Sequence, residues 1–178
     1  MQKCNVALAK LTSVGLLACM ALGAQPLATG SLLVATAKSH DADFAHSVVL
    51  LIRYDPESAV GLMLNRPTSV PITEALPDAK GKSVTVFAGG PVTIGVRGLL
   101  RSKASPFFTI VSNKTELLRI IAIGMPPLRI YAGYTGWTTQ QLQSEVARGL
   151  WKVLSPKADT VFDPRPEALW QRLAATRK

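Results

Sequence analysis

Four short motifs, in which glycine or proline ends or interrupts an apolar run, constrain this sequence most. They are Gly30-Ser-Leu-Leu-Val-Ala35, Gly61-Leu-Met-Leu-Asn-Arg-Pro67, Gly89-Gly-Pro-Val92 and Gly133-Tyr-Thr-Gly-Trp137. Glycine permits sharp turns and close backbone approach, and proline removes a backbone donor, so we expect these motifs at strand ends. They specify backbone shape, and none of them supplies a nucleophile, a base or a metal ligand.

The composition is that of one globular domain with a core. The chain has 178 residues, of which 48% are hydrophobic and 17% charged. Both cysteines, Cys4 and Cys19, lie in the N-terminal segment, so the body has no thiol for a disulfide, a zinc site or a nucleophile. The formal net charge of +9 is spread along the chain. It indicates either a solvated basic face or weak attraction to polyanions and anionic lipid.

Residues 1–24 have the pattern of a targeting segment. A short basic region precedes an uncharged stretch from Leu11 to Ala24, which is shorter than the about 20 residues of a membrane span and suits a signal peptide. Three interpretations are open: secretory cleavage, lipidation of Cys19, or a translation start at Met20. The first two predict a periplasmic or lipid-anchored protein, and the third a cytoplasmic one. Membrane contact is expected only through the lipid anchor.

The remainder is interpreted as a linker (25–29), one domain (30–174) and a basic tail (175–178). Strands are predicted over 32–37, 47–54, 59–65, 84–88, 98–101, 107–112, 128–134 and 161–162. Helices are predicted near 72–76, after a cap at Asn113, after a capping box of Thr138 and Gln141 that ends at Gly149, and from Asp163 onward. This order lacks βαβ alternation and predicts a single-domain α+β fold, with a mixed, mostly antiparallel sheet and three or four helices.

Five motifs in order resemble the YqgE/AlgH family. They are the four above, the last of them extended by Gln141-Leu-x-x-Glu145, together with Phe44-x-x-Ser47-Val-Val-Leu. The resemblance runs from about Gly30 to Leu173 and implies an α+β domain with a coiled, bifurcated sheet. Some family members carry a transcriptional-regulator label, which comes from regulation of exopolysaccharide production and not from a recognised DNA-binding element.

This chain departs from the family pattern in two respects. Family members more often have a histidine or an acid where this chain has Arg53 and Tyr54, and a histidine near Leu100 and Arg101. The family is also usually cytoplasmic, whereas this chain has a leader.

The candidate ligand site comprises Asn65, Arg66, Gly89, Gly90 and Trp137. Arg66 could form a fork to a carboxylate or phosphate, and the N–H groups of the two glycines could bind an anion. Trp137 could line the same pocket. The alternative is structural: Asn65 bonds its own loop, Arg66 pairs with an acid, the glycines form a tight turn, and Trp137 packs in the core.

His40-Asp41-x-Asp43-x-x-His46-Ser47 is the one cluster with catalytic residue types. It suggests a metal site or a Ser-His-Asp arrangement, which requires His40 and His46 to converge on one exposed spot. The alternative, a solvated loop in which Asp41 or Asp43 caps a turn, is preferred. We therefore predict no catalytic residue, no metal and no cofactor.

Three functions are consistent with these observations. The preferred one is a non-enzymatic binding or regulatory module with a small anionic ligand or a protein partner. The second is a hydrolase-like enzyme that uses the His40–Ser47 cluster. The third is a transcription-related regulator in the cytoplasm; the basic charge permits DNA binding, but no helix-turn-helix pattern is visible and no specific nucleic acid is expected.

Overall fold

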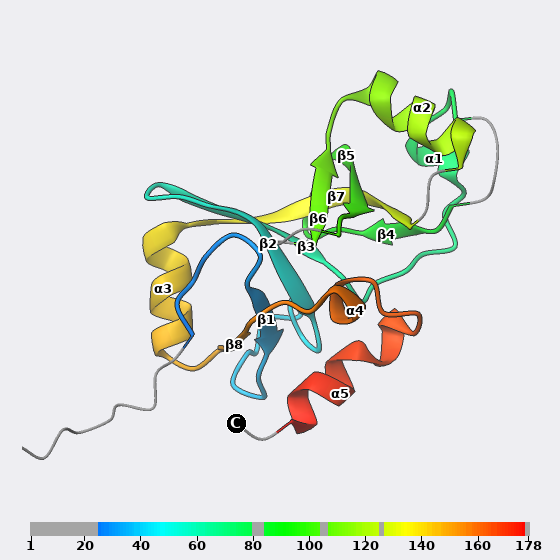
Figure 1. Cartoon of the computed structure of the whole chain (residues 1–178). Helices are drawn as coiled ribbons and strands as arrows, with labels where there is room; N and C mark the ends of the chain where they lie inside the picture. The colour runs from blue at the N-terminus through cyan, green and yellow to red at the C-terminus, as the bar shows by residue number, and fades with distance from the viewer. Residues whose placement is uncertain (1–24, 80–83, 104–106, 125–126, 177–178) are drawn as a thin grey trace, which may run out of the picture.

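The computed structural model describes residues 25–79, 84–103, 107–124 and 127–176. The predicted leader with Cys19 and the end of the basic tail lie outside this part of the chain. The described residues form eight strands, five α-helices and one 3-10 helix in a single α+β domain (Figure 1), as predicted. Most of the strand pairs are antiparallel.

The strands are β1 (Leu32–Ala35), β2 (Val48–Tyr54), β3 (Ser58–Met63), β4 (Val86–Ala88), β5 (Val92–Arg101), β6 (Phe108–Val111), β7 (Leu128–Thr138) and β8 (Trp151–Leu154). The helices are α1 (Ile72–Ala75), α2 (Lys114–Ile123), α3 (Thr139–Ala147), α4 (Ala158–Val161), the 3-10 helix η1 (Pro166–Ala168) and α5 (Leu169–Ala175). None of the helices in these ranges is long and apolar enough to cross a membrane.

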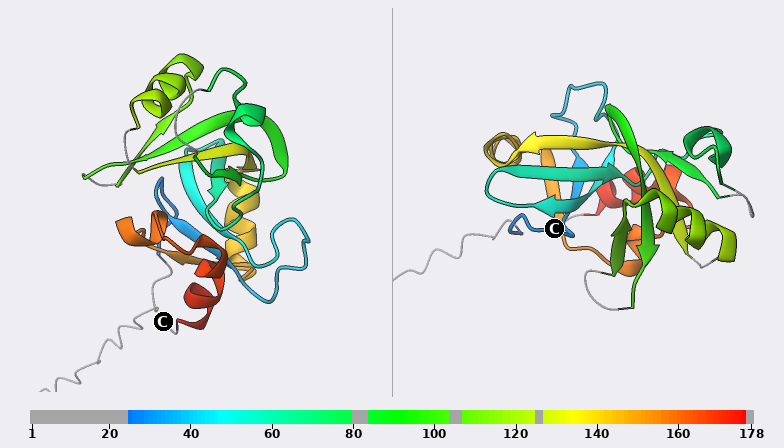
Figure 2. Two further views of the ribbon diagram at one scale, coloured as in Figure 1. Left: turned by 90° about the vertical axis from the view of Figure 1, so that its right-hand side faces the viewer. Right: turned by 90° about the horizontal axis from the view of Figure 1, so that it is seen from above.

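The long strand β7 divides the sheet into two arms. The strand order is β6-β5-β7-β3-β2-β1-β8, with β4 beside β7 in parallel. The first half of β7, residues 128–134, pairs with β5 and β4, whereas residues 135–138 pair with β3. One arm therefore carries β4, β5 and β6, and the other carries β1, β2, β3 and β8, as Figures 1 and 2 show. This geometry matches the bifurcated sheet that the family resemblance implies.

Helices cover both faces of the second arm. Neighbouring strand residues alternate between two hydrophobic clusters, which is why every residue of β1 is buried. Leu142 of α3 belongs to one cluster and Leu169 of α5 to the other. On the first arm, Leu117 and Ile121 of α2 pack against Ile130 of β7 in a third cluster.

Two predicted helix starts are confirmed by their caps. Asn113 accepts a hydrogen bond from the Glu116 N–H at 3.0 Å, and Thr138 accepts one from the Gln141 N–H at 3.1 Å. The predicted capping box is only half formed. Its second hydrogen bond, from the Thr138 backbone N–H to the Gln141 side chain, does not appear, and the Gln141 side chain donates instead to Glu145 at 3.0 Å. The predicted terminal glycine, Gly149, follows α3 with a φ of +76°.

The predicted strand at 161–162 is wrong. Residues 158–161 form the single helical turn α4, in which the Val161 N–H donates to the Lys157 carbonyl at 3.0 Å. The strand beside β1 is instead β8, which begins at Trp151, two residues after Gly149. The described residues form more helices than the three or four predicted. The additional ones are the single turn α4 and the 3-10 helix η1, which leads directly into α5.

Candidate ligand-binding cleft

Asn65 and Arg66 hold the loop of residues 41–46 against the sheet. The Asn65 side chain accepts from the Val48 N–H and donates to the His46 carbonyl, both at 2.8 Å. Arg66 Nη2 donates to the carbonyls of Asp43, at 2.8 Å, and Ala45, at 3.3 Å. Both side chains thus have structural partners, and a ligand at Arg66 stays a prediction.

Gly89 and Gly90 let the chain approach β7 closely. The Gly89 N–H donates to the Ala132 carbonyl at 2.8 Å, so it already has a partner within the sheet. A Cβ atom at Gly89 would lie 2.2 Å from the Gly133 oxygen, and one at Gly90 would lie 2.5 Å from the Tyr134 backbone. The backbone of Arg66 lies beside this segment, because its carbonyl accepts from the Ala88 N–H at 2.9 Å.

Trp137 lies in a different environment from the glycine pair. Its indole is 6% exposed and packs with the rings of Phe44 and Trp151, whose centroids are 5.4 and 6.0 Å away. One carboxylate oxygen of Glu145 accepts from the Nε1 of Trp137 at 3.1 Å and from that of Trp151 at 2.8 Å. The structure thus brings Asn65 and Arg66 together and the two glycines together, and places Trp137 in the cluster on the α3 face.

The polar residues of the histidine-containing loop bond to nearby backbone. Asp41 accepts from the Asp43 N–H at 2.9 Å, and the fully buried Ser47 donates its hydroxyl to the Phe44 carbonyl at 2.7 Å. The ring of His46 lies 4.2 Å from that of Trp170. These contacts suit the structural interpretation of the loop. In the described ranges, no group of three or more His, Cys, Asp or Glu residues is arranged to hold a metal ion.

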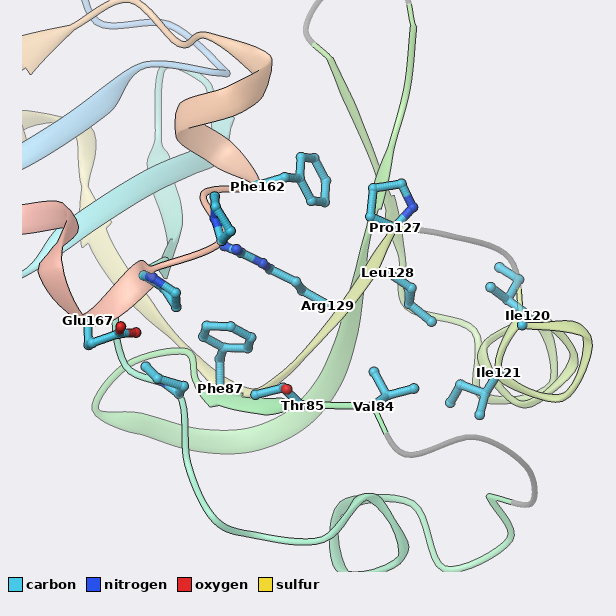
Figure 3. Close-up of a pocket in the computed structure, with 14 residues that line it drawn as sticks. Val84, Thr85, Phe87, Ile120, Ile121, Pro127, Leu128, Arg129, Phe162 and Glu167 are labelled. Atoms are coloured by element: carbon cyan, nitrogen blue, oxygen red, sulfur yellow. The ribbon is translucent and has the colours of Figure 1, made fainter.

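A cleft of about 600 Å³ opens between the two arms of the fold, in a region that the sequence analysis did not single out. Its lining includes Phe87 of β4, Ile120 and Ile121 of α2, Arg129 of β7, and the segment of residues 162–167 (Figure 3). The walls are mainly apolar and rich in proline, and Thr85, Arg129 and Glu167 contribute the polar side chains. Its volume lies within the roughly 300–1,000 Å³ of small-molecule sites.

Strand pairing and one arginine create this cleft. The parallel pairing of β4 with β7 places Phe87 opposite Tyr131. Arg129, near the start of β7, donates from Nη1 to the Val161 carbonyl at 3.0 Å and from Nη2 to the Asp163 carbonyl. These bonds fix the segment that follows α4 beside β7, and so form the wall opposite α2.

Aromatic rings flank the Arg129 guanidinium, whose central carbon lies 5.0 Å from the Phe87 ring centroid and 5.8 Å from that of Phe162. Such stacking favours a cation that is partly removed from water. Phe87 packs in turn on Tyr131, with ring centroids 5.2 Å apart. Burial raises the pKa of Tyr131 to about 12.

One local feature of the sequence is compatible with such a cleft, although no motif marks it. Arg129 is the only charged residue in the predicted strand 128–134. A charge inside an apolar strand demands partners or an opening to solvent, because burial without them is costly. The contributions of Phe87, Phe162 and α2 had no such signal, since apolar side chains in these segments suit an ordinary core equally well.

Comparison with known proteins identifies relatives across most of the chain. An AlgH-like family model (DUF179) matches residues 32–177. A UPF0301 protein of Streptomyces avermitilis is 33% identical over 174 residues, covering 82% of this chain and 84% of that protein. A UPF0301 protein of Streptomyces coelicolor is 35% identical over 162 residues, with the same two coverages.

Two solved structures have a similar fold. The solution structure of the AlgH protein from Pseudomonas aeruginosa superimposes with a TM-score of 0.70 and 26% identity, covering 86% of this chain and 90% of that one. The crystal structure of protein DIP2367 from Corynebacterium diphtheriae shares the fold, with a TM-score of 0.68 and 22% identity over 86% and 88% of the two chains. From the match of the family model and the identity to these relatives, the chain belongs to the AlgH-like family.

Proposed function

We propose that this protein is a non-enzymatic binding module whose ligand occupies the cleft between α2 and residues 162–167. The observation that carries the proposal is the cleft itself, which combines about 600 Å³ of space with mostly apolar lining residues and three polar side chains. Those are the usual properties of a small-molecule site, in which apolar walls provide affinity and isolated polar groups fix orientation.

The side chains of the cleft support binding rather than catalysis. Its polar members are Thr85, Arg129 and Glu167, and the described lining contains no histidine or cysteine. Arg129 is engaged with two backbone carbonyls, which suits a positioning role. A nucleophile paired with a base, which hydrolysis by an activated side chain needs, is not among these groups.

Titration with a matched pair of small aromatic ligands tests the proposal. We choose 2-naphthoate and 2-naphthamide, whose fused ring can stack on the half-buried Phe162 at the cleft. Calorimetry or ligand-detected NMR should show saturable binding of at least one of them at one site per chain. Absence of saturable binding by both would refute the proposal.

Two threonine substitutions locate the binding site. Thr85 is exposed at the cleft, so Thr85→Trp should fill the cavity and remove binding without unfolding the protein. Thr109 is exposed on the terminal strand β6, outside the lining of the cleft, and Thr109→Trp is the matched control that should bind normally. Equal loss of binding in both variants, or unchanged binding in both, would contradict the location of the ligand in the cleft.

A further inference from the structure

The charge of Arg129 is the feature of the cleft that most restricts its ligand. The side chain is partly buried between two phenylalanine rings, and its two observed hydrogen bonds go to the carbonyls of Val161 and Asp163. A carbonyl accepts a hydrogen bond but carries no net charge. The positive charge is therefore oriented by the protein without being neutralised by it.

Two nearby arginines, Arg101 and Arg172, differ from Arg129 in this respect because each pairs with a carboxylate. Arg101 lies 5.5 Å from the ring of Phe162 and forms an ion pair with Asp159 at 2.6 Å. The carboxylate of Asp163, whose carbonyl accepts from Arg129, is itself paired with Arg172. Among the described residues, no carboxylate lies within ion-pair distance of Arg129. Glu167 lines the same cleft but lies outside that distance.

The two ends of the cleft have different chemistry. In Figure 3, Ile120 and Ile121 of α2 lie at one end, and Arg129, Phe162 and Glu167 lie toward the other. The two carbonyls engage only part of the guanidinium's donor fork, and the remaining N–H groups suit a planar or tetrahedral anion. Apolar walls lower the local dielectric constant and so strengthen such a contact.

We propose that the cleft binds a small organic anion, with an apolar aryl or acyl body against α2 and a carboxylate or phosphate head on Arg129. This inference rests on the proposed function and assigns its ligand class. It moves the anion contact that the sequence suggested for Arg66 to an arginine that, unlike Arg66, lines the cleft and stacks on two aromatic rings.

Matched ligands test the anion contact separately from the cleft. 2-Naphthoate and 2-naphthamide share one ring system and differ in charge at the head. In the unmodified protein, 2-naphthoate should bind about tenfold more tightly than 2-naphthamide, since a hydrogen bond to a charged group contributes about that factor. Equal affinities would overturn the ligand class and leave the binding module intact, whereas no binding of either would overturn both.

Arginine variants assign the preference to one side chain. Arg129→Gln should abolish the preference for 2-naphthoate. Because Arg129 also bonds the wall of the cleft, 2-naphthamide should bind this variant more weakly but still measurably. The control is Arg101→Gln, which removes a cation stacked on the same Phe162 ring and should leave the preference unchanged. A preference that persists in Arg129→Gln, or that disappears in Arg101→Gln, would overturn the assignment.

A third and a fourth variant keep the test decisive if Arg129→Gln does not fold. Arg129→Lys retains the charge and should retain a preference for 2-naphthoate. Glu167→Gln changes an exposed carboxylate at the cleft and should tighten 2-naphthoate alone, because it removes a repulsive charge. Loss of the preference in Arg129→Lys, or no change for 2-naphthoate in Glu167→Gln, would contradict a charge-based contact.

Discussion

Arg129 Nη1 donates a hydrogen bond to the carbonyl of Val161 at 3.0 Å and so joins β7 to the last residue of α4. The two residues are far apart in sequence, yet this bond places Phe162 and Glu167 across from α2. The cleft therefore depends on a long-range contact of one charged side chain. Its other wall depends on the parallel pairing of β4 with β7.

Replacing Asn65 by alanine should destabilise the fold rather than act only on ligand binding. The substitution leaves the Val48 N–H and the His46 carbonyl without their side-chain partner, and a buried unpaired group costs about 1–3 kcal/mol. Urea unfolding measures the effect. Asn113→Ala, which removes only the cap of α2, should cost about 1 kcal/mol. An Asn65→Ala protein of unchanged stability would contradict the structural role.

The Glu145 carboxylate should be a stability determinant of the α3 face. Glu145→Ala removes the acceptor shared by the indoles of Trp137 and Trp151, which are 6% and 4% exposed. The free energy of unfolding should fall by at least about 1–3 kcal/mol. Gln143→Ala on the same helix removes an exposed bond to Tyr54 and should change stability by less than about 0.5 kcal/mol. Similar losses in the two variants would argue against the shared acceptor.

The two glycines of the Gly133-Tyr-Thr-Gly136 motif should tolerate alanine differently. Gly133 has a φ of +76°, and a Cβ there would lie 2.5 Å from the Val92 oxygen. Gly133→Ala should therefore cost at least about 1–3 kcal/mol. At Gly136 the nearest atom to an added Cβ is 3.6 Å away, so Gly136→Ala should fold with little loss. Thermal unfolding of both variants compares them directly, and equal stability would contradict the close packing of β5 on β7.

Tyr131→Phe should cost little stability at neutral pH, because the fully buried hydroxyl has no hydrogen-bond partner of regular geometry among the described residues. Its contact with the nearby Arg129 side chain is the smallest of the influences on its pKa. Burial raises the folded-state pKa of Tyr131 from 10.0 to about 12. The folded state therefore holds the proton more tightly than the unfolded state, and the associated stability is present below pH 10 and lost as the pH rises toward 12.

The difference in unfolding free energy between wild type and Tyr131→Phe should therefore change as the pH rises above 10. Between pH 10 and 12, wild type should lose about 2–3 kcal/mol more unfolding free energy than Tyr131→Phe. Comparing the two by urea unfolding at each pH cancels the titration of the lysines. Parallel pH profiles would show that Tyr131 titrates normally.

Local patterns predicted the elements, and long-range pairing determined the cleft. The caps at Asn113 and Thr138 follow from side-chain chemistry within a few residues, so the sequence predicts them directly. In contrast, β8 owes its identity to pairing with β1, and residues 161–162 form a turn despite their strand-like composition. Tertiary context outweighs local preference in such short apolar segments.

The candidate site residues show the same contrast between what local sequence determines and what long-range contacts determine. Asn65, Arg66, Gly89 and Gly90 follow the ends of strands, as their motifs predict, but the groups that contact them come from distant segments. Sequence spacing alone does not distinguish a side chain that binds a ligand from one that fixes a loop. Arg129 belongs to no motif, and its importance depends on the segment after α4, which local periodicity cannot position.

The amide spectrum of the ¹⁵N-labelled protein, recorded during titration with 2-naphthoate, tests the central claim most directly. If the ligand occupies the cleft, the shifts should concentrate at residues 84–87, 120–124, 128–129 and 162–167, which contain or adjoin its lining. Arg129→Gln should reduce these shifts, and Arg101→Gln should preserve them. Shifts confined to residues 41–47 and 65–66 would instead place the ligand at Arg66 and contradict the account.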